Sequence, residues 1–148
     1  MYNYTFIIPH KNSPELLYRW LESIPSRDDI QIIIVDDNSD PKIVNQDNFP
    51  FKIRKNVEVI FNKYSKGAGY ARNLGLQLAI GKRQLFPDAD DFYVDGFIDI
   101  LDNKVNSDND IIYFDVFSYE NNKKCKHVYI NSIFENYYII SYNNINTI

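Results

Sequence analysis

The sequence contains one cysteine, two histidines and no strong excess of charge of either sign. A single cysteine, Cys125, excludes an internal disulfide and a cysteine-ligated metal cluster, so a reducing compartment is expected. His10 and His127 are too far apart in the chain to form a spaced ligand pair, and each is expected to be structural or exposed. The net charge of -4 and the pI near 5.1 argue against a surface that neutralises nucleic-acid phosphates, so nucleic acid is not an expected partner.

Long hydrophobic runs are also missing. No apolar stretch approaches the roughly 20 residues that cross a bilayer, and no basic region or cleavage site precedes the first apolar run. These absences favour a cytoplasmic protein, whose membrane association would be peripheral and through a part missing from this chain. With 45% hydrophobic and 24% charged residues, the 148 residues suffice for one packed core.

Short apolar runs alternate with helical patterns along most of the chain. The runs that predict strands are 4–8, 31–35, 57–61, 83–86 and 110–117, with a returning strand at 127–130. Helices are predicted from an N-cap at Ser13 to Pro25, from Gly69 to a C-cap at Gly81, and over 94–105, and the tail is predicted to be weakly helical. This alternation predicts an α/β fold with a mainly parallel sheet, whose ligands bind at the carboxyl ends of the strands.

Acidic clusters follow two of the predicted strands. Asp36 and Asp37 end the run 31–35, and Asp88, Asp90 and Asp91 follow the run 83–86. Carboxylates held this close repel one another unless a cation or solvent compensates, and hard cations such as Mn²⁺ or Mg²⁺ bridge carboxylates to substrate phosphates. A solvated turn, in which aspartates bond their own backbone, gives the same composition. The shared position at strand ends favours the binding site.

A glycine-containing loop, Lys66–Asn73, leads into a predicted helix, whose free N–H groups favour an anion. It lacks the G-K-[ST] ending of a Walker loop, and Arg72 replaces the third glycine of a dinucleotide fingerprint. An ordinary turn is the alternative for this loop taken alone.

Four motifs stand in a recognisable order over roughly residues 4–117. They are Phe6-Ile7-Ile8-Pro9-His10-Lys11-Asn12, Ile33-Ile34-Val35-Asp36-Asp37-Asn38-Ser39, Lys66-Gly67-Ala68-Gly69-Tyr70-Ala71-Arg72-Asn73-Leu74-Gly75 and Phe86-Pro87-Asp88-Ala89-Asp90-Asp91. With these motifs in this order, the sequence resembles glycosyltransferase family 2, whose members are inverting nucleotide-sugar transferases. The resemblance implies the GT-A fold, which is Rossmann-like with helices on both faces of the sheet.

The resemblance also implies roles for individual residues. It places Asp37 at the nucleotide base, Arg72 at the base or phosphates, and Pro9 to Asn12 along one wall, and Lys66 is counted among the substrate-binding residues. Asp88 and Asp90 are the D-x-D carboxylates near the ribose and the metal, with Asp91 as the rival of Asp90 for the metal.

The implied activity is transfer of a sugar from a nucleoside diphosphate to another molecule. The implied partners are a nucleoside-diphosphate sugar, with a UDP-sugar favoured, Mn²⁺ or Mg²⁺, and a saccharide or lipid-linked acceptor, and the implied setting is bacterial surface polysaccharide synthesis. In the family the metal neutralises the diphosphate as it leaves, and a carboxylate base deprotonates the acceptor.

The sequence departs from the family pattern at three points. Lys11 stands where many members have an aromatic residue that stacks on the base, and Pro87 replaces the usual apolar residue before the D-x-D motif. The catalytic base and the acceptor-binding half normally lie well beyond that motif, so no base is assigned. Residues 1–148 are therefore interpreted as a single donor-binding domain that lacks the acceptor-binding part.

Two other interpretations of the residues remain open, and the first loop argues against a third. A phosphoacceptor receiver domain also gathers acids around Mg²⁺ at strand ends, although its acid pair follows the first strand. A non-catalytic nucleotide-sugar-binding domain would share the donor motifs. A sugar nucleotidyltransferase would have a glycine-rich, basic first loop, and the loop from Pro9 to Asn12 has no glycine.

Overall fold

The computed structural model describes residues 1–47, 49, 54–113, 116–120, 123–127 and 145–147. The chain divides into two compact units, Met1–Val105 and Asn106–Ile148. All of the candidate site residues belong to the first unit. The interpretation of 1–148 as one donor-binding domain stays a prediction.

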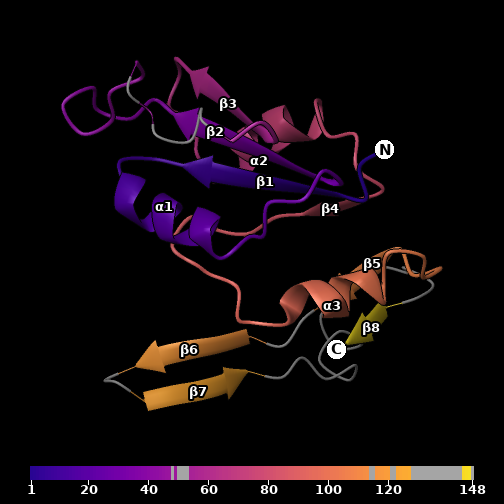
Figure 1. The fold of residues 1–148 in the computed structure, drawn as a ribbon. Helices are drawn as coiled ribbons and strands as arrows, with labels where there is room; N and C mark the ends of the chain where they lie inside the picture. Colours follow the sequence, from indigo (N-terminus) through magenta and orange to yellow (C-terminus); the bar gives the residue numbers. More distant parts are fainter. Residues whose placement is uncertain (48, 50–53, 114–115, 121–122, 128–144, 148) are drawn as a thin grey trace. The chain divides into compact units, whose positions relative to one another are not determined.

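The first unit is built on a four-stranded parallel sheet (Figure 1). Its strands are β1 (Tyr4–His10), β2 (Ile30–Asp37), β3 (Val57–Asn62) and β4 (Arg83–Leu85), in the spatial order β3-β2-β1-β4. Every residue of β2 is buried, as expected for a strand covered on both faces. The four strands predicted from apolar runs in this unit and the parallel sheet are confirmed.

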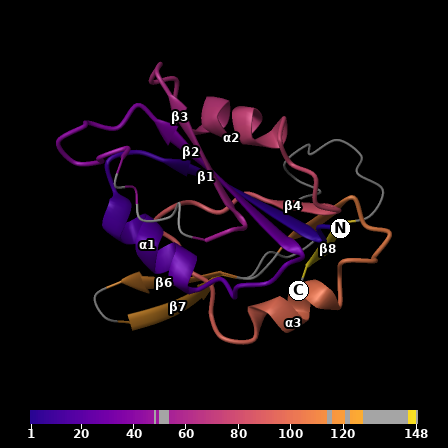
Figure 2. The same cartoon turned by 45° about the horizontal axis from the view of Figure 1, so that its top comes forward.

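Helices α1 (Pro14–Glu22) and α2 (Ala68–Leu76) cover opposite faces of this sheet (Figure 2). Trp20 of α1 packs edge-on against Phe6, with ring centroids 5.6 Å apart. On the other face, Gly75 of α2 lies so close to Ile7 that an added Cβ would stand 2.4 Å from Ile7 Cγ2. Because Phe6 and Ile7 are neighbours in a strand, they point to opposite faces. Helices on both faces are therefore confirmed.

Ser13 is the N-cap residue of α1, as predicted, but the predicted end of α2 is wrong. The Ser13 side chain makes no cap hydrogen bond to α1, and its hydroxyl instead donates to the Lys11 carbonyl. Helix α2 ends at Leu76 rather than at Gly81. Gly81 lies where a Cβ would approach the Tyr4 carbonyl carbon to 2.5 Å, so close packing of two backbone segments explains this glycine.

The amino ends of β1 and β2 are joined by a buried polar network. Thr5 Oγ1 donates to Gln31 Oε1 at 2.7 Å and accepts from the Gly81 N–H at 2.9 Å. The amide of Gln31 donates to the Leu78 carbonyl and its Oε1 accepts from the Ile80 N–H. The network therefore pins the connection between α2 and β4 to the sheet.

A second network at the amino end attaches helix α3 (Phe97–Asp102). The Tyr4 hydroxyl donates to Asp102, and Arg27 forms ion pairs with Asp29 and Asp102. Burial and the hydrogen bond to Asp102 raise the pKa of Tyr4 above its usual range. The predicted helix over 94–105 is shorter in the structure.

The second unit contains two small pairs of strands among its described residues. Strand β5 (Ile111–Tyr113) pairs in parallel with β8 (Ile145–Thr147), and β6 (Val116–Glu120) pairs antiparallel with β7 (Lys123–His127). The single strand predicted at 110–117 is thus two strands around residues 114–115, which lie outside the described part. The returning strand is confirmed but spans 123–127 instead of 127–130, and residues 128–130 are not described. The prediction of a helical tail is wrong at 145–147, which form strand β8, and residues 131–144 lie outside the described residues.

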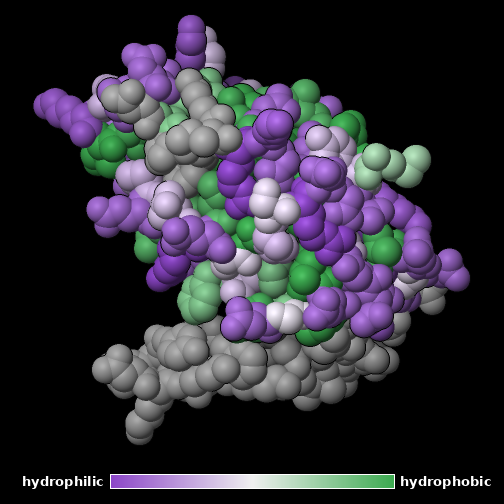
Figure 3. All heavy atoms as spheres, in the orientation of Figure 1, coloured by the Kyte–Doolittle hydropathy of each residue, from purple (hydrophilic) through white to green (hydrophobic). Residues whose placement is uncertain are grey.

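On the face shown in Figure 3, hydrophilic residues make up most of the coloured surface, and hydrophobic side chains form separate groups. Among the residues that the structure describes, none belongs to a helix with the length and apolarity of a membrane span.

Candidate functional site

The end of β1 meets the end of β2 through a buried histidine and an aspartate. His10 and Asp36 are register partners, and His10 Nδ1 lies 2.8 Å from Asp36 Oδ2. Asp36 also accepts hydrogen bonds from the backbone N–H and the hydroxyl of Ser39. Burial alone would raise the pKa of Asp36, but the hydrogen bonds from His10 and Ser39 outweigh it and hold that pKa below its usual range. Asp36 is therefore a buried anion with a structural role.

Asp37, the last residue of β2, turns its carboxylate to the loop between β3 and α2. It accepts from the Asn62 amide at 2.8 Å, from the backbone N–H groups of Lys66 and Gly67 at 3.1 and 2.8 Å, and more weakly from Ser65. Burial raises the pKa of Asp37, and these hydrogen bonds lower it more, so the group stays ionised. Asp37 is only 4% exposed, yet it lines the cavity described below.

The loops after β1 and β2 are bonded to each other. Asn12 and Asn38 both have positive φ, at 54° and 61°. The Asn12 N–H donates to Ser39 Oγ at 2.8 Å, and Asn12 Oδ1 accepts from the Asp40 N–H at 2.7 Å. Asn12 therefore braces the two loops.

The start of α2 faces the same region. Gly67 has a φ of 86°, which favours glycine, and the first turn of α2 has no acidic residue. A helix N-terminus of this kind favours an anion. The Lys66 ammonium lies 4.5 Å from the Tyr70 ring centroid, so Lys66 stacks on an aromatic ring, while Lys11 donates to Ser65.

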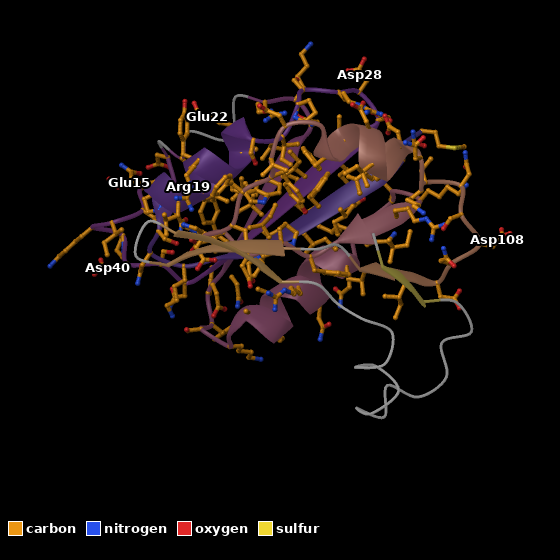
Figure 4. The ribbon with its side chains drawn as sticks, turned by 90° about the horizontal axis from the view of Figure 1, so that it is seen from below. Glu15, Arg19, Glu22, Asp28, Asp40 and Asp108 are labelled. Atoms are coloured by element: carbon orange, nitrogen blue, oxygen red, sulfur yellow. The ribbon has the colours of Figure 1, made fainter. Side chains whose placement is uncertain are left out.

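The acidic turn after β4 is held from both helices. Arg72 of α2 forms an ion pair with Asp88, and Arg19 of α1, labelled in Figure 4, donates to the Asp90 carbonyl. Burial, followed by the charges of Asp90 and Asp88, raises the pKa of Asp91. The negative charge of the three aspartates in this turn is therefore only partly compensated by the two arginines.

A cavity of about 390 Å³ opens at the carboxyl ends of the strands. Its lining comes from the loop after β1, the end of β2, the start of α2 and the turn after β4. The lining residues are Pro9, His10, Lys11, Ser13, Leu16, Asp37, Gly67, Ala68, Asp88, Ala89 and Asp90. The site thus lies at the sheet edge that the sequence predicts.

The candidate residues divide into two groups. Four of the eight line the cavity, namely Pro9, Asp37, Asp88 and Asp90. The other four, Asn12, Lys66, Arg72 and Asp91, are outside the lining and contact residues of the loops that form it. The sequence places the loop from Pro9 to Asn12 along one wall of the site, but it gives His10 of that loop no role of its own.

The carboxylates have the chemistry of a hard divalent-cation site that shares its ligands with a substrate. Asp88 and Asp90 both line the cavity. Within the described ranges, no group of three or more His, Cys, Asp or Glu residues could hold a metal ion. Mg²⁺ commonly uses one or two carboxylates and completes its shell with substrate phosphates and water. The residues present therefore fit a cation that arrives with a phosphorylated ligand.

Comparisons with known proteins identify the family and the fold. The model of glycosyl transferase family 2 matches residues 5–147. A curated relative, the *Escherichia coli* UDP-Glc:alpha-D-GlcNAc-diphosphoundecaprenol beta-1,3-glucosyltransferase WfaP, is 37% identical over 93 residues, which are 61% of this chain and 36% of that protein.

Solved structures share the fold. Residues 1–349 of *S. aureus* TarS align with a TM-score of 0.66 and 24% identity, over 77% of this chain and 35% of that chain. The mannosyltransferase PcManGT from *Pyrobaculum calidifontis* aligns with a TM-score of 0.52 and 22% identity, over 62% of this chain and 28% of that chain. The chain spans about a third of the length of these proteins. Because the family model matches nearly all residues of this chain, the chain belongs to glycosyl transferase family 2.

Proposed function

We propose that this chain binds a nucleoside-diphosphate sugar together with Mn²⁺ or Mg²⁺, as the donor-binding part of a glycosyltransferase. The observation that carries the proposal is the cavity at the carboxyl ends of the sheet. There the Pro9 wall, the Asp37 carboxylate, the start of α2 and two acids of the D-x-D turn meet around one space.

We assign each part of the donor to the lining residues whose chemistry suits it. We place the base between Pro9 and Asp37, where Lys11 also lines the cavity. The diphosphate lies at the start of α2, where backbone N–H groups and the helix dipole favour negative charge. Asp88 and Asp90 would hold the cation, which would supply positive charge to the departing diphosphate.

Arg72 supports the diphosphate end of this arrangement. Its guanidinium pairs with Asp88, and its buried Nε has no hydrogen-bond acceptor among the residues that the structure describes. A guanidinium has several donors in one plane, so it can keep a carboxylate and still bind a phosphate oxygen. Arg72 thus helps to screen Asp88 from the diphosphate.

The relatives support the choice of partners. WfaP is named for UDP-Glc as donor and a diphosphoundecaprenol-linked sugar as acceptor, TarS has been solved with UDP and UDP-GlcNAc, and PcManGT with GDP-Man and Mn²⁺. For this chain we propose a UDP-sugar, a saccharide or lipid-linked acceptor, and a cytoplasmic role in bacterial surface polysaccharide synthesis with peripheral membrane association. The sheet order supports this over a receiver domain, in which the order is 2-1-3-4-5.

Isothermal titration calorimetry with UDP tests the proposal. UDP should bind with Mn²⁺ or Mg²⁺ and lose most of its affinity after chelation, because the diphosphate then meets Asp88 and Asp90 unscreened. Asp90→Asn should weaken metal-dependent binding, whereas Asp28→Asn removes the same charge from an exposed position outside the cavity and should change nothing. Equal affinity after chelation, or no binding of any nucleoside diphosphate, would contradict the proposal.

A further inference from the structure

His10 is a buried polar residue of the cavity wall to which the proposed function gives no task. It is 2% exposed, and both ring nitrogens have partners. Nδ1 lies 2.8 Å from Asp36 Oδ2, and Nε2 lies 3.3 Å from the backbone nitrogen of Ser13, one residue before α1. Because the Ser13 N–H can only donate, Nε2 must accept, and the Nδ1–H therefore donates to Asp36. One imidazole thus joins the end of β2 to the start of α1.

The wall that His10 borders contains backbone conformations that need support. Asn12 and Asn38 both lie in the left-handed region, which is unfavourable for residues other than glycine, although asparagine tolerates it best. The bonds from Asn12 to Ser39 and Asp40 hold the two turns together. Ser39 in turn donates to Asp36, the partner of His10. The two strained turns and the histidine are therefore one connected network.

We propose that His10 is a positioning residue for the donor cavity. Through Asp36 and the Ser13 N–H it fixes the loop from Lys11 to Ser13, two residues of which line the cavity. The part of this inference that concerns the donor rests on the proposed function. The part that concerns the loop rests only on the hydrogen bonds of His10, Asp36 and Ser13. Both ring nitrogens of His10 are occupied by Asp36 and the Ser13 N–H, so its effect on the donor is exerted through the loop.

The tautomer of His10 provides the first test, since it needs no ligand and no variant. Free neutral imidazole exchanges between its two tautomers, whereas the bridge requires the proton on Nδ1. Nitrogen-15 NMR of the labelled chain at neutral pH should show His10 as the Nδ1–H tautomer with an unprotonated Nε2. A proton on Nε2 would overturn the bridge to Ser13.

Two substitutions separate the two bonds of the ring. In His10→Asn the side-chain amide can stand where Nδ1 stands and still donate to Asp36, but it cannot reach Ser13. In His10→Gln the terminal carbonyl can stand where Nε2 stands and accept from Ser13, but the donor to Asp36 is lost. Both variants keep a polar side chain in a buried place, and both should remain folded.

The matched control lies on the same pair of strands. Thr5 and Gln31 are register partners at the amino end, joined by a buried hydrogen bond just as His10 and Asp36 are at the carboxyl end. Thr5→Val therefore breaks a buried bond between β1 and β2 away from the cavity. It should lower the melting temperature without moving the affinity for UDP.

The readouts are the dissociation constant of UDP with Mn²⁺ and the hydrogen exchange of the Asn12 and Ser13 amides. Both His10 variants should raise the dissociation constant by about 10-fold or more, the effect of one lost hydrogen bond in the wall. Both should also speed exchange of the two amides, and Thr5→Val should do neither. Unchanged affinity and unchanged exchange in the folded His10 variants would overturn the inference. If the unaltered chain binds no nucleotide, the proposed function fails, and the amide exchange still decides the role of His10.

Discussion

The two ends of the β1–β2 strand pair use buried polar side chains in different ways. At the amino end, Thr5 and Gln31 bond to each other and to backbone groups of the connection into β4. At the carboxyl end, His10 lines a cavity, and its partner Asp36 bonds to Ser39 beside the turns with positive φ. The same parallel register therefore fastens the chain at one end and shapes the cavity at the other. Substitutions at the amino end should change stability alone, and substitutions at the carboxyl end should change affinity as well.

Asp37→Ala should have the largest effect, because the Asp37 carboxylate both stabilises the fold through its hydrogen bonds and lines the cavity. Losing its carboxylate leaves the Asn62 amide and the N–H groups of Lys66 and Gly67 without their acceptor. We expect a loss of about 1 to 3 kcal/mol of stability together with weaker UDP binding. Urea unfolding and calorimetry measure the two effects. Normal affinity in a destabilised variant would confine Asp37 to a structural role.

Gly81→Ala tests the amino end. The added Cβ would meet the Tyr4 backbone at 2.5 Å and the Thr5 nitrogen at 2.6 Å, and backbone atoms cannot move aside as a flexible side chain can. We expect a loss of about 1 to 3 kcal/mol, typical of overpacking, in thermal unfolding. UDP affinity of the folded fraction should stay unchanged. A large fall in that affinity would mean that the two ends are coupled.

Two arginines allow a matched comparison between the ends. Arg72→Ala removes the ion pair with Asp88 beside the cavity, and Arg27→Ala removes the pairs with Asp29 and Asp102 at the amino end. Partly exposed pairs contribute about 0 to 1 kcal/mol, so both variants should fold. Arg72→Ala should weaken UDP more than uridine, whereas Arg27→Ala should weaken neither. Equal losses of UDP and uridine in Arg72→Ala would place its guanidinium at the base.

Asp91→Asn should have the smallest effect, and its sign depends on pH. The pKa of Asp91 is raised in the folded chain, so its negative charge opposes folding at neutral pH. This penalty shrinks as the pH falls below the raised pKa and is gone below the pKa of the unfolded chain. Because solvent screens this exposed side chain, we expect a gain of at most about 0.5 kcal/mol at pH 7, and none well below about pH 4, where the carboxyl is protonated in both states. Thermal melts at the two pH values measure it. A lower melting temperature at pH 7 would contradict the repulsion.

The sheet was predictable because its strands are short apolar runs that stop at polar clusters. The run at 31–35 and the acids after it place Asp37 at a strand end, and parallel pairing does the rest. The partners of Asp37 were not predictable, because the loop that bonds to its carboxylate lies 25 to 30 residues away in sequence. Gly81 was misassigned for the same reason. Its close approach to Tyr4 is a tertiary contact, whereas a C-cap is a local signal.

His10 shows most clearly what could not be predicted from the sequence. A lone histidine after a strand is compatible with an exposed or a structural position, and nothing local identifies Asp36 and Ser13 as its two partners. The acidic turn was the opposite case. Three acids in four residues identify it without tertiary information, but its attachment to Arg19 and Arg72 depends on where the helices pack.

The strand order has a consequence for synthesis on the ribosome. Strand β1 obtains its partner β2 early, but its other edge waits for β4, which lies about 80 residues further along the chain. At about 5 to 20 residues per second, that edge stays unpaired for roughly 4 to 16 seconds after β1 is made. An exposed strand edge is a template for pairing with other chains. The nascent protein should therefore be most dependent on chaperones, and most prone to aggregate when translation stalls, in the interval between β2 and β4.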